Sequence, residues 1–179
     1  MIKKYFLAVS ALILGLIVLQ GCNSILMKKQ QTNRENMTGF QYKFTDSSVP
    51  PPYHRSYVID IDSDTIHVVV NSYGDILADT TFEAPAEALD TINNLLIQHK
   101  IVIKKQSSKD NAGCTGGTTQ SIAYTAQDSL LQTGSVYYCG GNAYGNVVGD
   151  FKKFGEDFRA TLVPQLGGII AKTTSASEK

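Results

Sequence analysis

Alternation of apolar and polar residues runs through the middle of this 179-residue sequence. Residues 40–45 carry an aromatic side chain at every second position, and residues 57–61 and 66–70 repeat the pattern with aliphatic ones. Successive side chains of a strand point to opposite faces, so a period of two predicts strands with one buried face. The turn-forming residues 63–64 between two of these runs predict an antiparallel hairpin, and a further strand is expected over 76–83.

Two stretches instead repeat apolar residues every three or four positions, as amphipathic helices do. The first spans residues 85–100 and opens on Pro85, which suits the first turn of a helix. The second is expected over 147–163, with Pro164 as its stop. Its apolar stripe, which we assign to the core, comprises Phe151, Phe154, Phe158 and Leu162.

Three more strands are expected, over residues 101–103, 118–126 and 130–139. The order of strands, helix, strands and helix predicts an α+β fold, with a mainly antiparallel sheet and both helices packed on one face. We expect one such domain over residues 38–170 and a disordered tail over residues 171–179.

The amino-terminal segment is unlike the rest of the chain. Two Lys lie near its start, an apolar run follows from residue 6 to residue 19, and residues 1–21 contain no acidic residue. Fourteen residues of helix span about 21 Å, which is short for a bilayer crossing but suits a signal peptide. The run ends in Leu19-Gln20-Gly21-Cys22. This sequence resembles the lipobox of bacterial lipoproteins, whereas the rest of the chain resembles no family.

The resemblance implies that Cys22 receives a diacylglyceryl group, that residues 1–21 are removed, and that a further acyl chain is added to the freed amine. Two or more chains give stable membrane attachment. Residues 22–37 are mostly polar and predict a flexible tether that reaches roughly 20 Å. Asn23 and Ser24 follow the cysteine, and neither is the Asp known to retain lipoproteins at the inner membrane. The outer membrane is therefore the expected location.

Three cysteines leave two for pairing once Cys22 carries lipid. The midpoint between Cys114 and Cys139 falls beside the turn expected at 127–129, so antiparallel pairing about that turn would bring them together. In an exported protein such a pair predicts a disulfide. The alternative, a nucleophilic or redox-active Cys139, lacks the CxxC spacing of redox motifs.

The sequence carries little sign of catalysis or of a cofactor. Without the signal peptide the chain has 14 basic and 16 acidic residues, so it lacks the excess of positive charge that is typical of nucleic-acid-binding proteins. Asp60, Asp62 and Asp64 have the spacing of the first three ligands of an EF-hand calcium loop, but the Gly and the final Glu that such a loop requires are absent. The three His have no zinc spacing, and the glycines match no nucleotide-binding motif. We therefore expect no metal, no cofactor and no catalytic set.

Two segments are better candidates for recognition. Residues 49–55 form a proline-rich stretch that is preformed for binding. Residues 140–146 predict a loop of the Tyr, Gly and Asn composition found in adaptable binding surfaces. The candidate contact residues are Pro51, Pro52, Tyr53, His54, Asn142 and Tyr144.

These observations favour a lipid-anchored, non-catalytic envelope domain with a binding or structural role, whose partner is an envelope protein or a glycan. One alternative is a small envelope hydrolase, whose site would gather Asp60, Asp62, His67 and His54 at one end of the sheet. Another is an inhibitor that presents its glycine-rich loop to an envelope enzyme. A cleft that joins His54 or His67 to carboxylates would favour catalysis, and a flat face bearing Tyr53 and Tyr144 would favour association.

Overall fold

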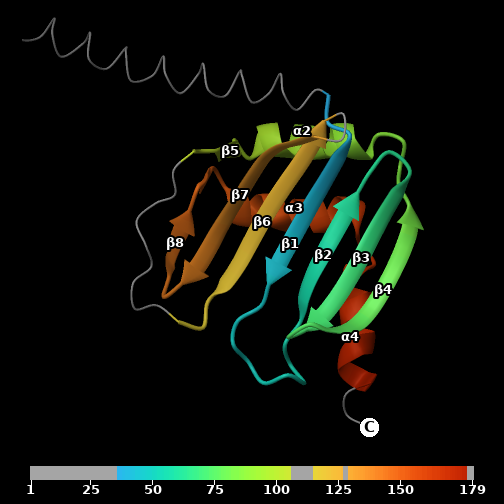
Figure 1. Ribbon diagram of the computed structural model, residues 1–179, viewed down its shortest axis with the longest axis vertical. Coiled ribbons are helices and arrows are strands. Elements are labelled where there is room, and N and C mark those ends of the chain that lie inside the picture. Colours follow the sequence, from blue (N-terminus) through green and yellow to red (C-terminus); the bar gives the residue numbers. More distant parts are fainter. Residues whose placement is uncertain (1–35, 106–114, 127–128, 177–179) are drawn as a thin grey trace, which may run out of the picture.

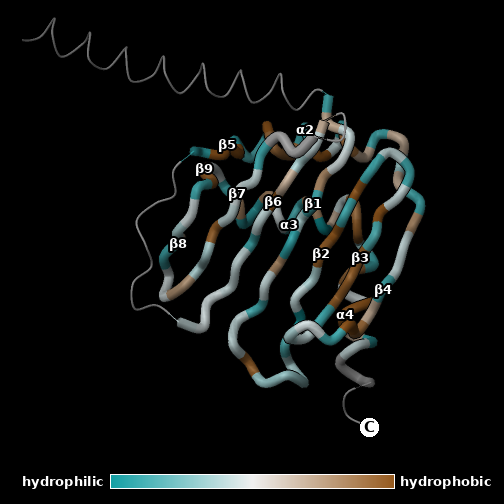
Figure 2. The backbone as a smooth tube through the Cα atoms, in the orientation of Figure 1, coloured by the Kyte–Doolittle hydropathy of each residue, from teal (hydrophilic) through white to brown (hydrophobic). Residues whose placement is uncertain are grey.

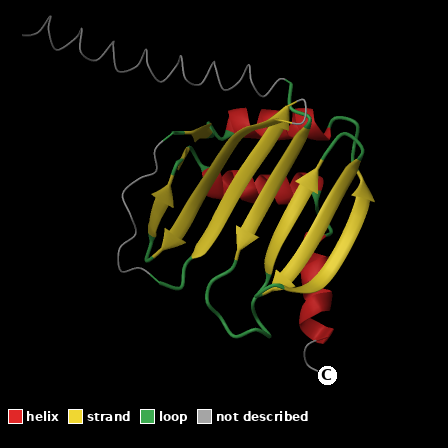
Figure 3. Ribbon diagram, in the orientation of Figure 1, coloured by secondary structure: helices red, strands yellow, loops and turns green. Residues whose placement is uncertain are grey.

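The computed structural model describes residues 36–105, 115–126 and 129–176. A seven-stranded sheet forms one layer and helices form the other (Figures 1 and 3). The strands of the large sheet are β1 (Gly39–Thr45), β2 (Ser56–Ile61), β3 (Thr65–Ser72), β4 (Asp75–Glu83), β6 (Thr118–Ala126), β7 (Ser129–Cys139) and β8 (Asn142–Gly145). A small second sheet contains β5 (Val102–Ile103) and β9 (Val147–Val148), and the helices are α2 (Ala88–Gln98), α3 (Phe151–Leu162) and α4 (Leu166–Ala176).

The large sheet has the strand order β4-β3-β2-β1-β6-β7-β8, and every neighbouring pair is antiparallel. The first strand in the chain is thus the central one, flanked by two hairpins that are far apart in sequence. The predicted α+β class with a mainly antiparallel sheet is confirmed.

The alternation in the sequence reflects one buried face. Tyr42, Ile59 and Val68 are fully buried and face the helices, whereas the residues next to each of them along its own strand face away. Figure 2 shows the hydrophobic residues recurring along β2 and β3. Helix α3 packs its aromatic stripe against these strands, with the ring centroid of Phe158 5.4 Å from that of Phe40 and 5.1 Å from that of Tyr42. The Phe stripe is therefore core, as predicted.

The carboxyl-terminal third differs from expectation. Residues 147–148 form β9, and α3 begins only at Phe151, where the side chain of Asp150 accepts a hydrogen bond from the Lys153 amide. A third helix, α4, follows Pro164 and includes residues 171–176, which were predicted to belong to a disordered tail. Its buried Leu166 and Thr173 supply the packing that orders it.

The strands run between two ends of the domain. Residue 36 and the turn at 62–64 lie at one, which we call the N-terminal end (Figure 1). The loop 46–55, the turn at 73–74 and the turn at 140–141 lie at the other, which we call the far end.

The predicted disulfide depends on Cys114, which lies outside the described residues. The β6–β7 ladder pairs Thr118 with Tyr138, which places Cys139 opposite the segment that leads into β6. The Sγ atom of Cys139 lies 3.5 Å from the carbonyl oxygen of Thr115, next to Cys114 in sequence. The pairing stays a prediction.

Candidate functional site

One face of the large sheet carries no helix among the described residues (Figure 3), and we call it the open face. Alternation along each strand places short polar side chains there. The register aligns one row across six strands, from β4 to β7, so that residues far apart in sequence become neighbours. That row comprises Thr81, His67, Asp60, Gln41, Ala123 and Thr133.

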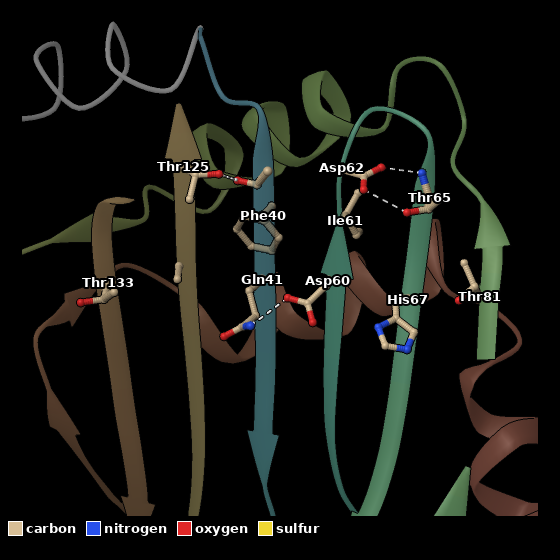
Figure 4. Close-up of a pocket in the computed structure, with 12 residues that line it drawn as sticks. Phe40, Gln41, Asp60, Ile61, Asp62, Thr65, His67, Thr81, Thr125 and Thr133 are labelled. Atoms are coloured by element: carbon tan, nitrogen blue, oxygen red, sulfur yellow. Dashed lines mark hydrogen bonds between the residues drawn. The ribbon is translucent and has the colours of Figure 1, made fainter. Parts of the chain in front are cut away.

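The row lies in a hollow of about 870 Å³ (Figure 4), which we call the sheet trough. A second hollow of about 440 Å³ adjoins it and shares Gln41, Ala123 and Thr133. Small side chains help to form the depression: at Gly39, an added Cβ would lie 2.8 Å from Thr125 Oγ1. The adjoining hollow adds polar side chains, namely Ser121, Ser135, Asn146 and Lys105.

An amide and a carboxylate meet at the centre of the trough. Gln41 Nε2 donates a hydrogen bond of 2.8 Å to Asp60 Oδ1 (Figure 4), because β1 and β2 pair these residues directly. The bond leaves the Gln41 carbonyl and the second Asp60 oxygen to accept hydrogen bonds from a ligand. Next to them, His67 Nε2 lies 2.8 Å from Asp79 Oδ1.

Asp62 has a structural role at the N-terminal end of the trough. Its Oδ1 accepts hydrogen bonds from the amides of Asp64 and Thr65, and its Oδ2 accepts one from the Thr65 hydroxyl. These hydrogen bonds, above all the two from backbone amides, stabilise the charged carboxylate and hold the pKa of Asp62 below its usual range. An exposed aspartate that closes the β2–β3 turn accounts for the calcium-loop pattern in the sequence. In the described part of the chain, no group of three or more His, Cys, Asp or Glu is placed to hold a metal ion.

The residues suggested for a hydrolase meet only in part. Asp60, Asp62 and His67 all line the trough, which is the arrangement that favours catalysis. His54 does not join them, because it is buried at the far end. Its ring stacks on Tyr73 at 4.0 Å, and its Nε2 lies 3.3 Å from Ser56 Oγ.

The proline-rich segment is a fixed turn rather than an extended polyproline helix. The Tyr53 amide donates to the carbonyl of Pro50, and the Ser72 hydroxyl donates to that of Pro51. Pro52 is exposed in the same turn, and the side chain of Tyr53 is 68% exposed. The segment is therefore preformed as a turn and not as an extended polyproline helix, and its role in binding stays a prediction.

The second predicted loop is mostly strand β8. Asn142 pairs with Cys139 and Tyr144 with Tyr137, so the segment forms the edge of the sheet. The rings of Tyr137 and Tyr144 lie 6.5 Å apart, and both are partly exposed at the β7–β8 margin of the open face. Tyr144 thus borders the open face, whereas Tyr53 lies at the far end.

The trough itself was not predicted, because its members come from six strands and only the register brings them together. Comparison of the chain with family models, curated proteins and solved structures gave no match. None of the helices in the described ranges is long and apolar enough to cross a membrane.

Proposed function

We propose that this protein is a bacterial lipoprotein, anchored through Cys22 to the outer membrane, whose domain binds a glycan in the sheet trough without cleaving it. The anchor rests on the lipobox-like sequence and the polar segment that follows it. The binding role rests on the trough, and above all on the Gln41–Asp60 pair at its centre.

The chemistry of the trough suits a ligand rich in hydroxyl groups. A sugar hydroxyl both donates and accepts hydrogen bonds, so it needs acceptors and donors side by side. The row supplies a carboxylate, an amide and threonine hydroxyls within one depression. Its length across six strands suits a chain of several sugar rings better than a compact metabolite.

The state of the polar groups argues for binding over hydrolysis. A general acid needs a raised pKa, whereas hydrogen bonds lower the pKa of Asp62. The imidazole of His67 is engaged by Asp79, and its side chain is 40% exposed. Asp62 therefore does not suit the role of a general acid, which supports binding over cleavage.

A pair of arginine substitutions on one strand tests the binding site. Ala123→Arg places a long side chain in the trough, whereas Thr119→Arg places the same side chain on the open face of β6, four residues away and outside the trough. The full chain in detergent would be titrated with chitotetraose and mixed with insoluble peptidoglycan. We expect Thr119→Arg to bind like the wild type and Ala123→Arg to lose binding.

Asp60→Asn is the isosteric second variant, and it should weaken binding about ten-fold, as the loss of a charged hydrogen bond does. Absence of binding to both glycans by the wild type, or equal binding by both arginine variants, would refute the proposal.

The alternative of a hydrolase is favoured by one observation, the presence of Asp60 and Asp62 in one trough. Asp60 lies on β2 and Asp62 in the turn that follows it, and a pair of carboxylates can cleave a glycosidic bond. Release of reducing ends from the same glycans, lost in Asp60→Asn, would support this alternative in place of simple binding.

A further inference from the structure

Strand β4 forms one edge of the large sheet, and none of the described strands pairs with its outer side. Natural edge strands commonly avoid pairing by means of proline, lysine or a bulge. Residues 75–83 contain neither proline nor lysine. The β3–β4 register has one irregularity, at which Leu77 is the extra residue of β4, and residues 78–83 pair with β3 without interruption. Residues 78–83 therefore keep a row of backbone donors and acceptors on the outer side that an extended chain could pair with.

A groove of about 620 Å³ lies beside this edge, between β4 and α4. Helix α4 packs against β4 but does not cover it fully. Ala78 and Phe82, which lie on the helix side of the sheet, therefore stay partly exposed, whereas the inner strands are buried on that side. Ile169 and Gly168 form part of the helical wall, and Lys172 on the same wall disfavours basic side chains inside the groove. Side chains of an added strand that point towards the helix layer would enter this groove.

The charge of the edge indicates what kind of strand fits. Residues 75–83 include three carboxylates and no basic side chain: Asp75, Asp79 and Glu83. Pairing of two copies through this edge would set these carboxylates against each other, which is unfavourable. A strand with lysine or arginine on one face and aliphatic residues on the other satisfies both the edge and the groove.

We infer that β4 and α4 form a docking site for an extended basic segment of a protein partner, which adds to the sheet as an eighth strand. Backbone hydrogen bonds to β4 provide the pairing, and aliphatic side chains in the groove provide selectivity. Thr81 of β4 faces the sheet trough, whereas this site uses the backbone edge of β4 and the groove on its helix side.

Two neighbouring glycines of α4 provide a matched test. Gly168 lines the groove and Gly167 does not, and an added Cβ at either would meet nothing within 4 Å. The probe is a labelled nine-residue peptide of alternating lysine and valine, added to the full chain in detergent and followed by fluorescence anisotropy. We expect Gly168→Trp to weaken binding about ten-fold or more, because it occupies space needed by the aliphatic side chains. Gly167→Trp should bind the peptide like the wild type.

Three controls separate strand addition from attraction between charges. The same peptide with a central proline should not bind, because proline cannot complete the ladder. Asp75→Asn combined with Glu83→Gln should weaken binding, and bound peptide should slow amide exchange at residues 77–82. Equal binding of the proline peptide, or equal affinity of the two tryptophan variants, would overturn the inference. Dimerisation of the wild type that Gly168→Trp abolishes would assign the edge to a second copy and would also overturn it.

Discussion

Gly155 offers a sharp test of how α3 is seated on the sheet. It is buried in the middle of the helix, facing the central strand. A Cβ atom there would lie 2.6 Å from Tyr42 Oη and 2.9 Å from Gln120 Oε1, both closer than real contacts allow. Tyr42 has little room to yield, because it is fully buried between the rings of Tyr57 and Phe158.

Gly155→Ala brings opposing effects whose sizes can be compared. Alanine favours the helix by about 1 kcal/mol relative to glycine. Overpacking of a rigid core costs about 1–3 kcal/mol. The intruding methyl group also displaces the Tyr42 hydroxyl, which accepts a 2.7 Å hydrogen bond from Arg159 Nη1, and a bond to a charged donor contributes about 1.5–3 kcal/mol. The losses exceed the gain, so we expect a net destabilisation of about 1.5–5 kcal/mol.

Gly167→Ala is the matched control, since it makes the same change in a helix where nothing lies within 4 Å. Only the propensity term applies to it, and it should stabilise the protein by about 0.5–1 kcal/mol. Urea unfolding followed by circular dichroism gives both free energies of unfolding. If Gly155→Ala were as stable as the wild type, the close approach of α3 to Tyr42 would be wrong.

Three other predictions concern charge, thiols and the anchor. Because the pKa of Asp62 is lowered, its carboxylate adds stability above its unfolded pKa of about 4, and this stability is lost as the pH falls through the folded pKa. Between pH 5 and pH 2, the free energy of unfolding should therefore change less with pH in Asp62→Asn than in the wild type. An equal change in both proteins would contradict the assigned cause. Alkylation of the unfolded mature protein should label Cys114 and Cys139 only after reduction, and labelling without reductant would exclude the disulfide. Cys22→Ser should block processing of the precursor and abolish the membrane attachment that the lipid provides. A product that is still processed and membrane-bound would refute lipidation.

The strands were predictable because the pattern that specifies them is local. An alternating run such as residues 57–61 reports a single buried face, and the turn at 62–64 places the next strand beside it. Strand order was not predictable in this way, since β1 pairs with both β2 and β6 through contacts distant in sequence.

Helix α4 escaped prediction for a physical reason. Gly167 and Gly168 lower its helix propensity and interrupt its apolar periodicity, and Pro164 marks an apparent end. The helix is ordered by tertiary contacts: Arg55 is buried and donates hydrogen bonds from Nε to Thr173 Oγ1 at 2.8 Å and from Nη2 to the Thr173 carbonyl at 3.1 Å. A cation beside the last helical turn also suits the helix dipole.

The candidate site was even less visible in the sequence. Thr81, Gln41 and Thr133 are ordinary solvent-facing residues when each strand is considered alone, and they form a site only because the register places them in one row. The sequence drew attention to Asp60 and Asp62 through their spacing but suggested calcium or catalysis, because a short motif does not reveal that Gln41 lies opposite Asp60.

The position of the trough relative to the chain's first described residue links binding to the proposed anchor. The strands run from the N-terminal end to the far end, and the row from Thr81 to Thr133 crosses them near the N-terminal end (Figure 4). A glycan lying along this row would run across the strands, close to the end of the domain at which the proposed anchor joins it. Because the β4 edge opens sideways from the same sheet, a bound glycan and a docked protein strand would approach from different directions, so the domain could hold both at once.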